Sequence, residues 1–214
     1  RDRAGEPRLV LAEAGTGVGK TLGYLAPASV WAEKNRGPVW ISTYTRNLQR
    51  QLDGELDRLY PDRAVKEKKV VVRKGRENYL CLLNFDEAVH RVPAGGRADV
   101  VALGLMARWA AVSRDGDMVG GDFPAWLADL LGRGATLELT DTRGECVYSA
   151  CPHYAKCFIE RTVRRARRAE IVVGNHALIM TQAALGGGDE AARAFLPTRY
   201  VFDEGHHLFD AADA

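Results

Sequence analysis

A glycine-rich segment near the start of the chain, AEAGTGVGKT at residues 12–21, constrains the fold more than any other feature. It follows a short apolar run, Leu9–Leu11, which predicts a buried parallel strand. It precedes an apolar, helix-like segment that extends to about Lys34. Strand, glycine-rich turn and helix, in that order, are the context of a phosphate-binding loop, or P-loop. The alternative is a turn that merely joins a strand to a helix, but Gly-Lys-Thr at the helix start favours phosphate binding.

Each part of this loop has a chemical reason to hold a nucleotide. Glycines allow backbone N–H groups to turn toward phosphates, and the following helix adds the positive end of its dipole. We expect Lys20 to reach the β- and γ-phosphates of ATP and the Thr21 hydroxyl to ligate Mg²⁺. The predicted nucleotide-binding residues are Ala14, Gly15, Thr16, Gly17, Val18, Gly19, Lys20 and Thr21.

Strands and helices continue to alternate after the loop. The segment PVWIST at 38–43 predicts a second buried strand, and leucines at helical spacing follow it in residues 45–60. The segment KVVVR at 69–73 predicts a third strand. This alternation predicts an α/β fold with a parallel, doubly wound sheet that binds ligands at the carboxyl ends of its strands.

An acidic pair follows another short apolar strand near the end of the chain. Residues 200–202 predict the strand, and Asp203 and Glu204 stand at its carboxyl end. We expect Asp203 to hold Mg²⁺ and Glu204 to orient or deprotonate the attacking water. By itself such a pair is usually a solvated turn, but the P-loop upstream favours the catalytic interpretation. We expect His206 and His207 to link the nucleotide state to the rest of the protein rather than to bind zinc, because adjacent side chains diverge.

Three of the four cysteines occur within thirteen residues. Cys146, Cys151 and Cys157 have C-x4-C-x5-C spacing, and Cys81 lies far upstream. Four thiolates suit tetrahedral zinc or an iron–sulfur cluster, and the spacing alone leaves both open. Four buried or free cysteines are the plainer alternative. The cysteines lie at the two ends of an insertion of about residues 78–168, whose middle predicts short helices separated by glycine- and proline-rich breaks.

Composition excludes several classes of protein. Of 214 residues, 46% are hydrophobic and 27% are charged, which is ordinary for a globular protein. No apolar run approaches the roughly 18 residues needed to span a membrane, and residues 1–10 do not resemble a secretory signal. We therefore expect a cytoplasmic protein without a membrane partner, in which disulfides are rare. The net charge is only +2, so any affinity for nucleic acid has to come from local basic patches.

These motifs, taken in order, resemble the DinG branch of the XPD-like, iron–sulfur superfamily 2 DNA helicases. The matching segments are EAGTGVGKT, STYTRNLQRQL, KGRENYLC, CVYSACPHYAKC, VVGNHALIM and VFDEGHH. The resemblance implies a RecA-like P-loop motor domain with an inserted, mainly helical iron–sulfur domain. It also implies that Cys81, Cys146, Cys151 and Cys157 hold a four-iron, four-sulfur (4Fe–4S) cluster, and that the protein unwinds DNA 5′→3′ with ATP.

The resemblance also divides the chain. It predicts residues 1–77 as the first part of motor domain 1, 78–168 as the cluster insertion and 169–214 as the rest of the domain.

Helicases of this superfamily commonly have alanine at the position of Ala14, whereas Gly205 replaces the usual alanine of the D-E-A-H motif. Glycine loosens the backbone beside Glu204 and removes no ligand. Because no second motor domain or arginine finger follows, we expect the chain to be a monomeric fragment that turns over little ATP alone.

Local charge predicts where DNA binds. Arg161, Arg164, Arg165 and Arg168 have helical neighbour spacing just after the last cysteine, and they predict a basic face that follows phosphates without reading sequence. Without the cysteines beside it, a solvated surface helix would be the preferred interpretation.

Thr43, Thr45 and Gln49 lie where a strand ends and a helix starts, and we expect hydrogen bonds from them to single-stranded or forked DNA. An ordinary exposed helix position is the alternative for Gln49. Asn175 is predicted to cap the helix that starts at His176.

Two hypotheses follow. The first is an ATP-driven DNA helicase acting in repair or replication. The second is a module that binds nucleic acid or senses redox state, with a decayed ATPase and a structural metal site. A decayed ATPase is expected to have lost at least one member of Lys20, Thr21, Asp203 and Glu204, and all four are present.

Overall fold

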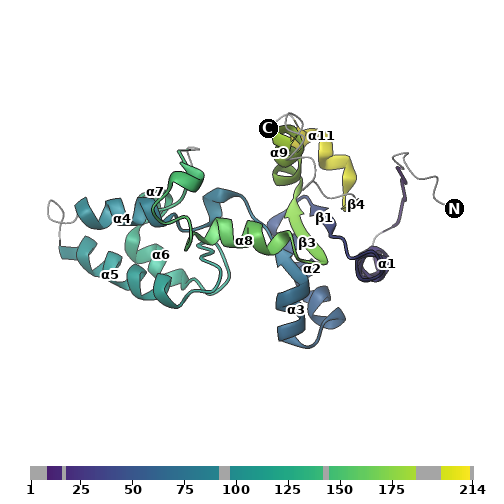
Figure 1. Cartoon of the computed structure of the whole chain (residues 1–214), viewed down its shortest axis with the longest axis horizontal. Helices are drawn as coiled ribbons and strands as arrows, with labels where there is room; N and C mark the ends of the chain where they lie inside the picture. The colour runs from purple at the N-terminus through teal and green to yellow at the C-terminus, as the bar shows by residue number, and fades with distance from the viewer. Residues whose placement is uncertain (1–8, 16–17, 92–96, 142–144, 187–198, 213–214) are drawn as a thin grey trace.

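The fold is an α/β sheet with a helical lobe beside it (Figure 1). The computed structural model describes residues 9–15, 18–91, 97–141, 145–186 and 199–212. Its strands are β1 (Val39–Thr43), β2 (Val70–Val72), β3 (Ile171–Asn175) and β4 (Arg199–Phe202). Its α-helices are α1 (Lys20–Asn35), α2 (Arg46–Leu59), α3 (Arg63–Lys69), α4 (Leu82–Arg91), α5 (Arg97–Val112), α6 (Ala125–Leu131), α7 (Arg133–Glu138), α8 (Phe158–Ala166), α9 (His176–Gly186) and α11 (Leu208–Ala212). Short 3₁₀ turns occur at η1 (Arg76–Asn78), η3 (Tyr148–Ala150) and η4 (Gly205–His207).

The four strands form one parallel sheet in the order β2-β3-β1-β4. The parallel α/β sheet predicted from the sequence is therefore confirmed. β1 lies between β3 and β4, so the carboxyl ends of these three strands lie side by side. Side chains that follow neighbouring parallel strands meet at this edge, which is where α/β folds bind ligands.

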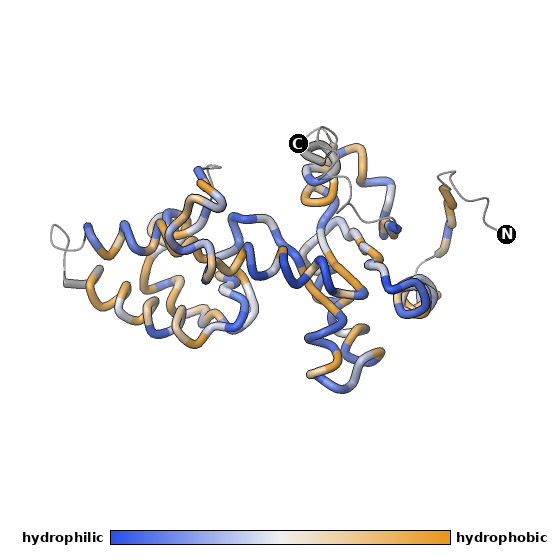
Figure 2. Tube along the Cα trace, in the orientation of Figure 1, coloured by the Kyte–Doolittle hydropathy of each residue, from blue (hydrophilic) through white to orange (hydrophobic). Residues whose placement is uncertain are grey.

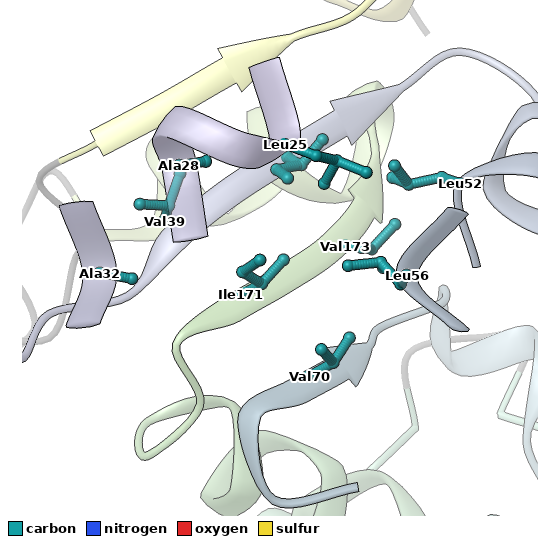
Figure 3. Close-up of a cluster of buried hydrophobic side chains, with 10 residues drawn as sticks. Leu25, Ala28, Ala32, Val39, Leu52, Leu56, Val70, Ile171 and Val173 are labelled. Carbon is teal, nitrogen blue, oxygen red and sulfur yellow. The ribbon is translucent and has the colours of Figure 1, made fainter. Parts of the chain in front are cut away.

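Both faces of the sheet are covered, because successive residues of a strand point to opposite sides. On one face, Val39 and Ile41 of β1 and Ile171 and Val173 of β3 pack with α1 and α2 (Figure 3). On the other face, residues such as Trp40 pack with the end of α8 and with α9. Two-sided burial explains why these strands are continuous apolar runs in the sequence.

One predicted strand is not formed. Leu9, Val10 and Leu11 belong to no strand and are 84%, 82% and 89% exposed. They form an extended, apolar segment that stands away from the sheet, before α1 (Figures 1 and 2). An apolar run becomes a strand only when a neighbouring strand accepts its hydrogen bonds, and no described strand lies beside it.

The helical lobe lies between β2 and β3 in the chain and has a core of its own. Its buried residues are Leu80, Met106, Trp109, Met118, Leu127, Leu139 and Phe158. These side chains pack α5 and α6 against the segments around residues 80, 118 and 139. Apolar stretches run through this lobe as well as through the sheet (Figure 2). The chain leaves the sheet after β2 and returns through α8, which joins the two lobes (Figure 1). This core shares no buried residue with the core that packs against the sheet.

Phe158 at the start of α8 packs closely against the lobe. Gly116 has φ of +68°, and a Cβ at this position would overlap the Phe158 ring. Glycine is therefore required here both by the backbone conformation and by the space available.

Among the described residues, no helix is both long enough and apolar enough to cross a membrane.

Candidate nucleotide and metal-cluster sites

The P-loop lysine and the acid pair meet at the carboxyl edge of the sheet. Lys20 Nζ lies 2.8 Å from Glu204 Oε1, although the two residues are 184 positions apart in the chain. Hydrogen bonding to Glu204 raises the pKa of Lys20, and hydrogen bonding to Lys20 lowers the pKa of Glu204. Both groups are therefore charged near neutral pH.

The helix that carries Lys20 begins as the P-loop motif predicts. Gly19 precedes α1 with φ of 77°, a conformation that glycine adopts without strain. Val18 is exposed, and Lys20 and Thr21 occupy the first two positions of the helix, where backbone N–H groups are unsatisfied. This helix end is suited to bind an anion. Thr16 and Gly17, also predicted to bind nucleotide, lie outside the described residues.

Tyr24 contacts Asp203, one of the two predicted magnesium ligands. Its hydroxyl donates a hydrogen bond of 3.2 Å to Asp203 Oδ2. Burial raises the pKa of Tyr24, and Asp203 adds to this effect while a hydrogen bond with Thr21 opposes it. Tyr24 was not predicted from the sequence, although it lies one helical turn after Lys20 and therefore on the same face of α1.

The acid pair occupies a tight turn. The main-chain N–H of Asp203 donates to the carbonyl of Ser42 in β1 at 2.8 Å, which extends the sheet pairing to the first acid. Glu204 has φ of 54° and ψ of 48°, a left-handed conformation that is uncommon for a residue with a side chain. His207 stacks on Tyr44 with 3.8 Å between ring centroids, and His206 Nδ1 lies 3.6 Å from Glu204 Oε2.

The four cysteines line one pocket in the helical lobe. Arg76, Asp141, Tyr148 and Tyr154 also line it. Cys81 stands just before α4 and Cys157 just before α8, and unsatisfied N–H groups at helix starts favour a thiolate. Among the described residues, no three His, Cys, Asp or Glu side chains are placed to ligate a single metal ion.

Hydrogen bonds and a positive charge lie near two of the thiols. The Tyr148 N–H donates to Cys146 Sγ at 3.4 Å, and the positive charge of Arg76 lies near the same thiol. Burial raises the pKa of Cys81, and N–H groups of Asn84 and Leu83 partly oppose this effect. N–H···S hydrogen bonds are among the features that tune iron–sulfur clusters held by thiolates. Four cysteines around one pocket are the type of donor that holds iron–sulfur clusters.

The predicted DNA-binding residues near β1 are less accessible than expected. Thr43 is 0% and Gln49 5% exposed, so neither side chain is presented to a ligand in this structure. Gln49 is therefore not the ordinary exposed helix residue considered as an alternative. The Thr45 hydroxyl accepts a hydrogen bond from the N–H of Leu48 at 3.2 Å and caps α2. Contact of Thr43, Thr45 and Gln49 with DNA stays a prediction, and in this structure Thr43 and Gln49 are buried while Thr45 caps a helix.

Several arginines of the predicted basic face after Cys157 already make contacts within the protein. Arg161 donates to the main-chain carbonyl of Arg114, and Arg165 donates to that of Glu67 at 2.7 Å. Arg164 is exposed but contacts Ala155 O at 3.3 Å and lies over the Tyr154 ring. Arg168 is exposed and lies beyond the end of α8, so the predicted helical face does not continue to it.

A parallel sheet with a lysine-bearing loop and an acid pair at its carboxyl edge defines a P-loop nucleotide-binding domain. No family model matches the sequence. The chain is 36% identical to the ATP-dependent DNA helicase YoaA of Escherichia coli, over 97% of this chain and 31% of that protein. It is 34% identical to the ATP-dependent helicase DinG of Mycobacterium tuberculosis, over 94% of this chain and 32% of that protein. Over nearly its whole length, the chain is therefore similar to one part of proteins named YoaA or DinG helicases.

A third relative has a different name. The chain is 30% identical to the 3'-5' exonuclease DinG of Bacillus subtilis, over 94% of this chain and 20% of that protein. The chain therefore spans about a third or less of the length of the relatives it matches.

Proposed function

We propose that this chain forms the first motor domain of an ATP-dependent DNA helicase that moves 5′→3′ along single-stranded or forked DNA. The observation that carries the proposal is the contact of Lys20 with Glu204 beside Asp203, which assembles the groups that ATP hydrolysis needs. The relatives named helicases support the proposal, whereas the relative named an exonuclease is matched over only a fifth of its length. We expect the protein to act as a monomer in the cytoplasm, in DNA repair or replication.

The proposed domains follow the lobes. Residues 1–77 and 169–214 contribute to the motor domain, and residues 78–168 form the insertion that holds a 4Fe–4S cluster. We propose that the chain is part of a longer helicase whose second motor domain completes the ATP site. In the proposed insertion, Cys81, Cys146, Cys151 and Cys157 hold the cluster, which would supply a covalent cross-link between the two ends of the insertion.

The Lys20–Glu204 pair suggests how nucleotide binding prepares hydrolysis. In the structure, the ammonium of Lys20 pairs with the carboxylate of Glu204 at 2.8 Å. The phosphates of ATP carry more negative charge and compete for Lys20, with Mg²⁺ held by Thr21 and Asp203. Glu204 is then released to orient the attacking water. Phosphate binding and water activation are coupled because they share one lysine.

Replacement of Glu204 by glutamine tests this assignment in the complete helicase. Glu204→Gln should lower the ATP hydrolysis rate by about 10²–10⁴-fold, the range typical for loss of a general base. Binding of ATP with Mg²⁺ should persist, because Lys20, Thr21 and Asp203 remain. Steady-state hydrolysis and equilibrium nucleotide binding measure the two effects separately.

Glu170→Gln is the matched control, because Glu170 pairs with Lys69 at 3.1 Å away from the nucleotide site. It should leave both measurements unchanged. If Glu204→Gln instead prevents nucleotide binding, the roles of Asp203 and Glu204 have been assigned incorrectly.

The arginines near α8 should separate into two groups. Arg164→Ala and Arg168→Ala should weaken binding of single-stranded DNA about equally for all sequences, because phosphate contacts carry no sequence information. Each should reduce the slope of log affinity against log salt by about 0.7–1. Arg165→Ala should instead lower thermal stability, because it removes the hydrogen bond to Glu67.

DNA titrations at several salt concentrations, together with thermal melts, distinguish these groups. Arg58→Ala is the control, because Arg58 pairs with Glu55 on the surface of α2. Unchanged salt slopes for Arg164→Ala and Arg168→Ala would mean that DNA binds elsewhere on the protein.

A further inference from the structure

One ring contact beside the acid pair is not used by the function proposed above. Tyr44 directly follows β1, and its ring lies 3.8 Å from the ring of His207, centroid to centroid, with 11° between the two planes. Near-parallel aromatic rings in contact attract one another. The stack joins the segment between β1 and α2 to the segment that follows β4, two parts of the chain that are far apart in sequence.

His207 also belongs to the turn that follows Glu204. Its main-chain N–H donates a hydrogen bond of 3.0 Å to the main-chain carbonyl of Glu204, which closes η4. The ring that stacks on Tyr44 and the N–H that bonds Glu204 are parts of one residue. Contacts that fix the His207 ring therefore also restrict the main chain of Glu204.

The His207 ring is held from a second direction. Its Nδ1 lies 3.2 Å from Asp210 Oδ2 in α11. A carboxylate only accepts hydrogen bonds, so Nδ1 carries a proton and donates it to Asp210. Asp210 thus fixes one edge of the imidazole while Tyr44 stacks on its face, and the two contacts together define the orientation of the ring.

The acidic turn is attached to β1 and its end on both sides of Glu204. Before Glu204, the main-chain N–H of Asp203 donates to the carbonyl of Ser42 in β1 at 2.8 Å. After Glu204, His207 stacks on Tyr44, which directly follows β1. Glu204 lies between these two attachments, so the direction of its side chain depends on both.

Glu204 needs this support because its own backbone conformation is unfavourable. Its φ of 54° and ψ of 48° are left-handed, a conformation in which Cβ comes too close to the following carbonyl oxygen. The attraction within one aromatic pair is similar in size to this cost. The stack is therefore large enough to decide whether the turn keeps the observed conformation or relaxes to another.

We infer that Tyr44 is a positioning residue for Glu204, and that it acts through the ring of His207. The stack holds η4, and η4 holds the main chain from which the Glu204 carboxylate extends to Lys20. A displacement of about 1 Å can lower a catalytic rate by about 100-fold, so a contact outside the reacting groups is sufficient to influence hydrolysis. The inference rests on the proposed ATPase function.

Two substitutions of Tyr44 in the complete helicase test the role of its ring. Tyr44→Ala should lower kcat for ATP hydrolysis by about 2- to 10-fold, the change in a conformational equilibrium that follows from loss of one aromatic pair. The KM for ATP should be unchanged, because Lys20 and the P-loop are untouched. Tyr44→Phe should keep the kcat of the unsubstituted helicase, because a phenyl ring stacks without the hydroxyl.

A double substitution tests whether Tyr44 acts through His207. His207→Ala removes the ring and keeps the main-chain N–H that bonds Glu204, so it should lower kcat by at least the factor seen for Tyr44→Ala. The variant that combines both substitutions should be no slower than His207→Ala alone, because residues that act through one shared contact are not additive.

Tyr200→Ala is the matched control. Tyr200 is 38% exposed and Tyr44 is 41% exposed, and each stacks on one neighbouring ring, but the partner of Tyr200 is Phe202 of its own strand. Tyr200→Ala should leave kcat unchanged. Thermal melts identify which variants are folded, and His207→Ala carries the test if Tyr44→Ala does not fold.

The outcomes separate this inference from the proposed function. No ATPase activity in the unsubstituted helicase would refute both. An active helicase whose folded Tyr44→Ala or His207→Ala variant retains normal kcat would refute the inference alone. A loss in the double variant equal to the product of the two single losses would also refute it, because the two residues would then act independently. Equal losses in Tyr44→Ala and Tyr44→Phe would assign the effect to the hydroxyl and not to the stack.

Discussion

Replacing Lys20 by alanine should abolish ATP hydrolysis by the complete helicase, with a loss of about 10³-fold or more in rate. Lys20 is the only residue of the described site that both starts α1 beside the P-loop and pairs with Glu204. Its charge is expected to stabilise the β- and γ-phosphates as negative charge develops during transfer. Removal of one such preorganised group typically costs about 10²–10³-fold, and Lys20→Ala also removes the partner that regulates Glu204.

The fold should survive this change. Lys20 is part-exposed and contributes to no hydrophobic core, and α1 is held to the sheet by Leu25, Ala28 and Ala32. Thermal melts should therefore match the unsubstituted protein, and iron content should be unaltered. Lys34→Ala is the matched control, because Lys34 lies in the last turn of the same helix, far from the acid pair. Normal ATPase activity of Lys20→Ala would refute the P-loop assignment.

Serine in place of Cys81 or Cys151 should remove the cluster and loosen residues 78–168. Anaerobically purified protein should be brown and contain about four irons per chain, as a four-thiolate 4Fe–4S site requires. Cross-links over long loops typically stabilise by about 2–4 kcal/mol. Loss of the cluster would therefore raise the population of molecules with an unfolded insertion by about 30- to 1,000-fold. Limited proteolysis measures this as faster cleavage within the insertion.

The motor domain should tolerate the same substitutions. Its strands lie outside the segment between Cys81 and Cys157, and its core does not share residues with the core of the helical lobe. ATP binding should therefore persist, while DNA unwinding should fail because α8 and its arginines are no longer held in place. Iron content, nucleotide binding and unwinding give three separate measurements.

Ser149→Ala is the control for the cysteine variants, because Ser149 is exposed within the same cysteine-rich segment. It should retain iron and unwinding activity. Colourless protein that contains one zinc and no iron would overturn the cluster assignment. Cysteine variants that lose iron and still unwind DNA normally would favour a sensing role for the cluster.

Local patterns predicted most of the motor domain. The apolar runs that became β1 and β2 were recognisable because strands buried on both faces need continuous apolar sequence. The helix after the P-loop and the Asn175 cap depend on neighbours within four residues, so the sequence was sufficient for them. The acid pair was predicted at the end of a strand, and β4 ends directly before it.

Several features that the sequence did not indicate depend on neighbours in space. Leu9–Leu11 has the composition of a strand, but a strand also needs a partner, and none of the described strands pairs with it. Thr43 and Gln49 have polar side chains, yet helix and sheet packing bury both of them. Arg165 is bound to Glu67 of α3, a contact between residues 98 positions apart that no local pattern indicates.

The sequence by itself determined which residues carry phosphate chemistry and which carry thiol chemistry, because each group depends on residue type and short spacing. Only the tertiary structure decided how the phosphate-binding residues cooperate. The strand order β2-β3-β1-β4 places Ser42 beside Asp203, and α1 brings Lys20 and Tyr24 to the acid pair, which no spacing in the chain implies. The physical reason is that parallel strands align their carboxyl ends whatever their separation in sequence, so the contacts at this edge are set by topology.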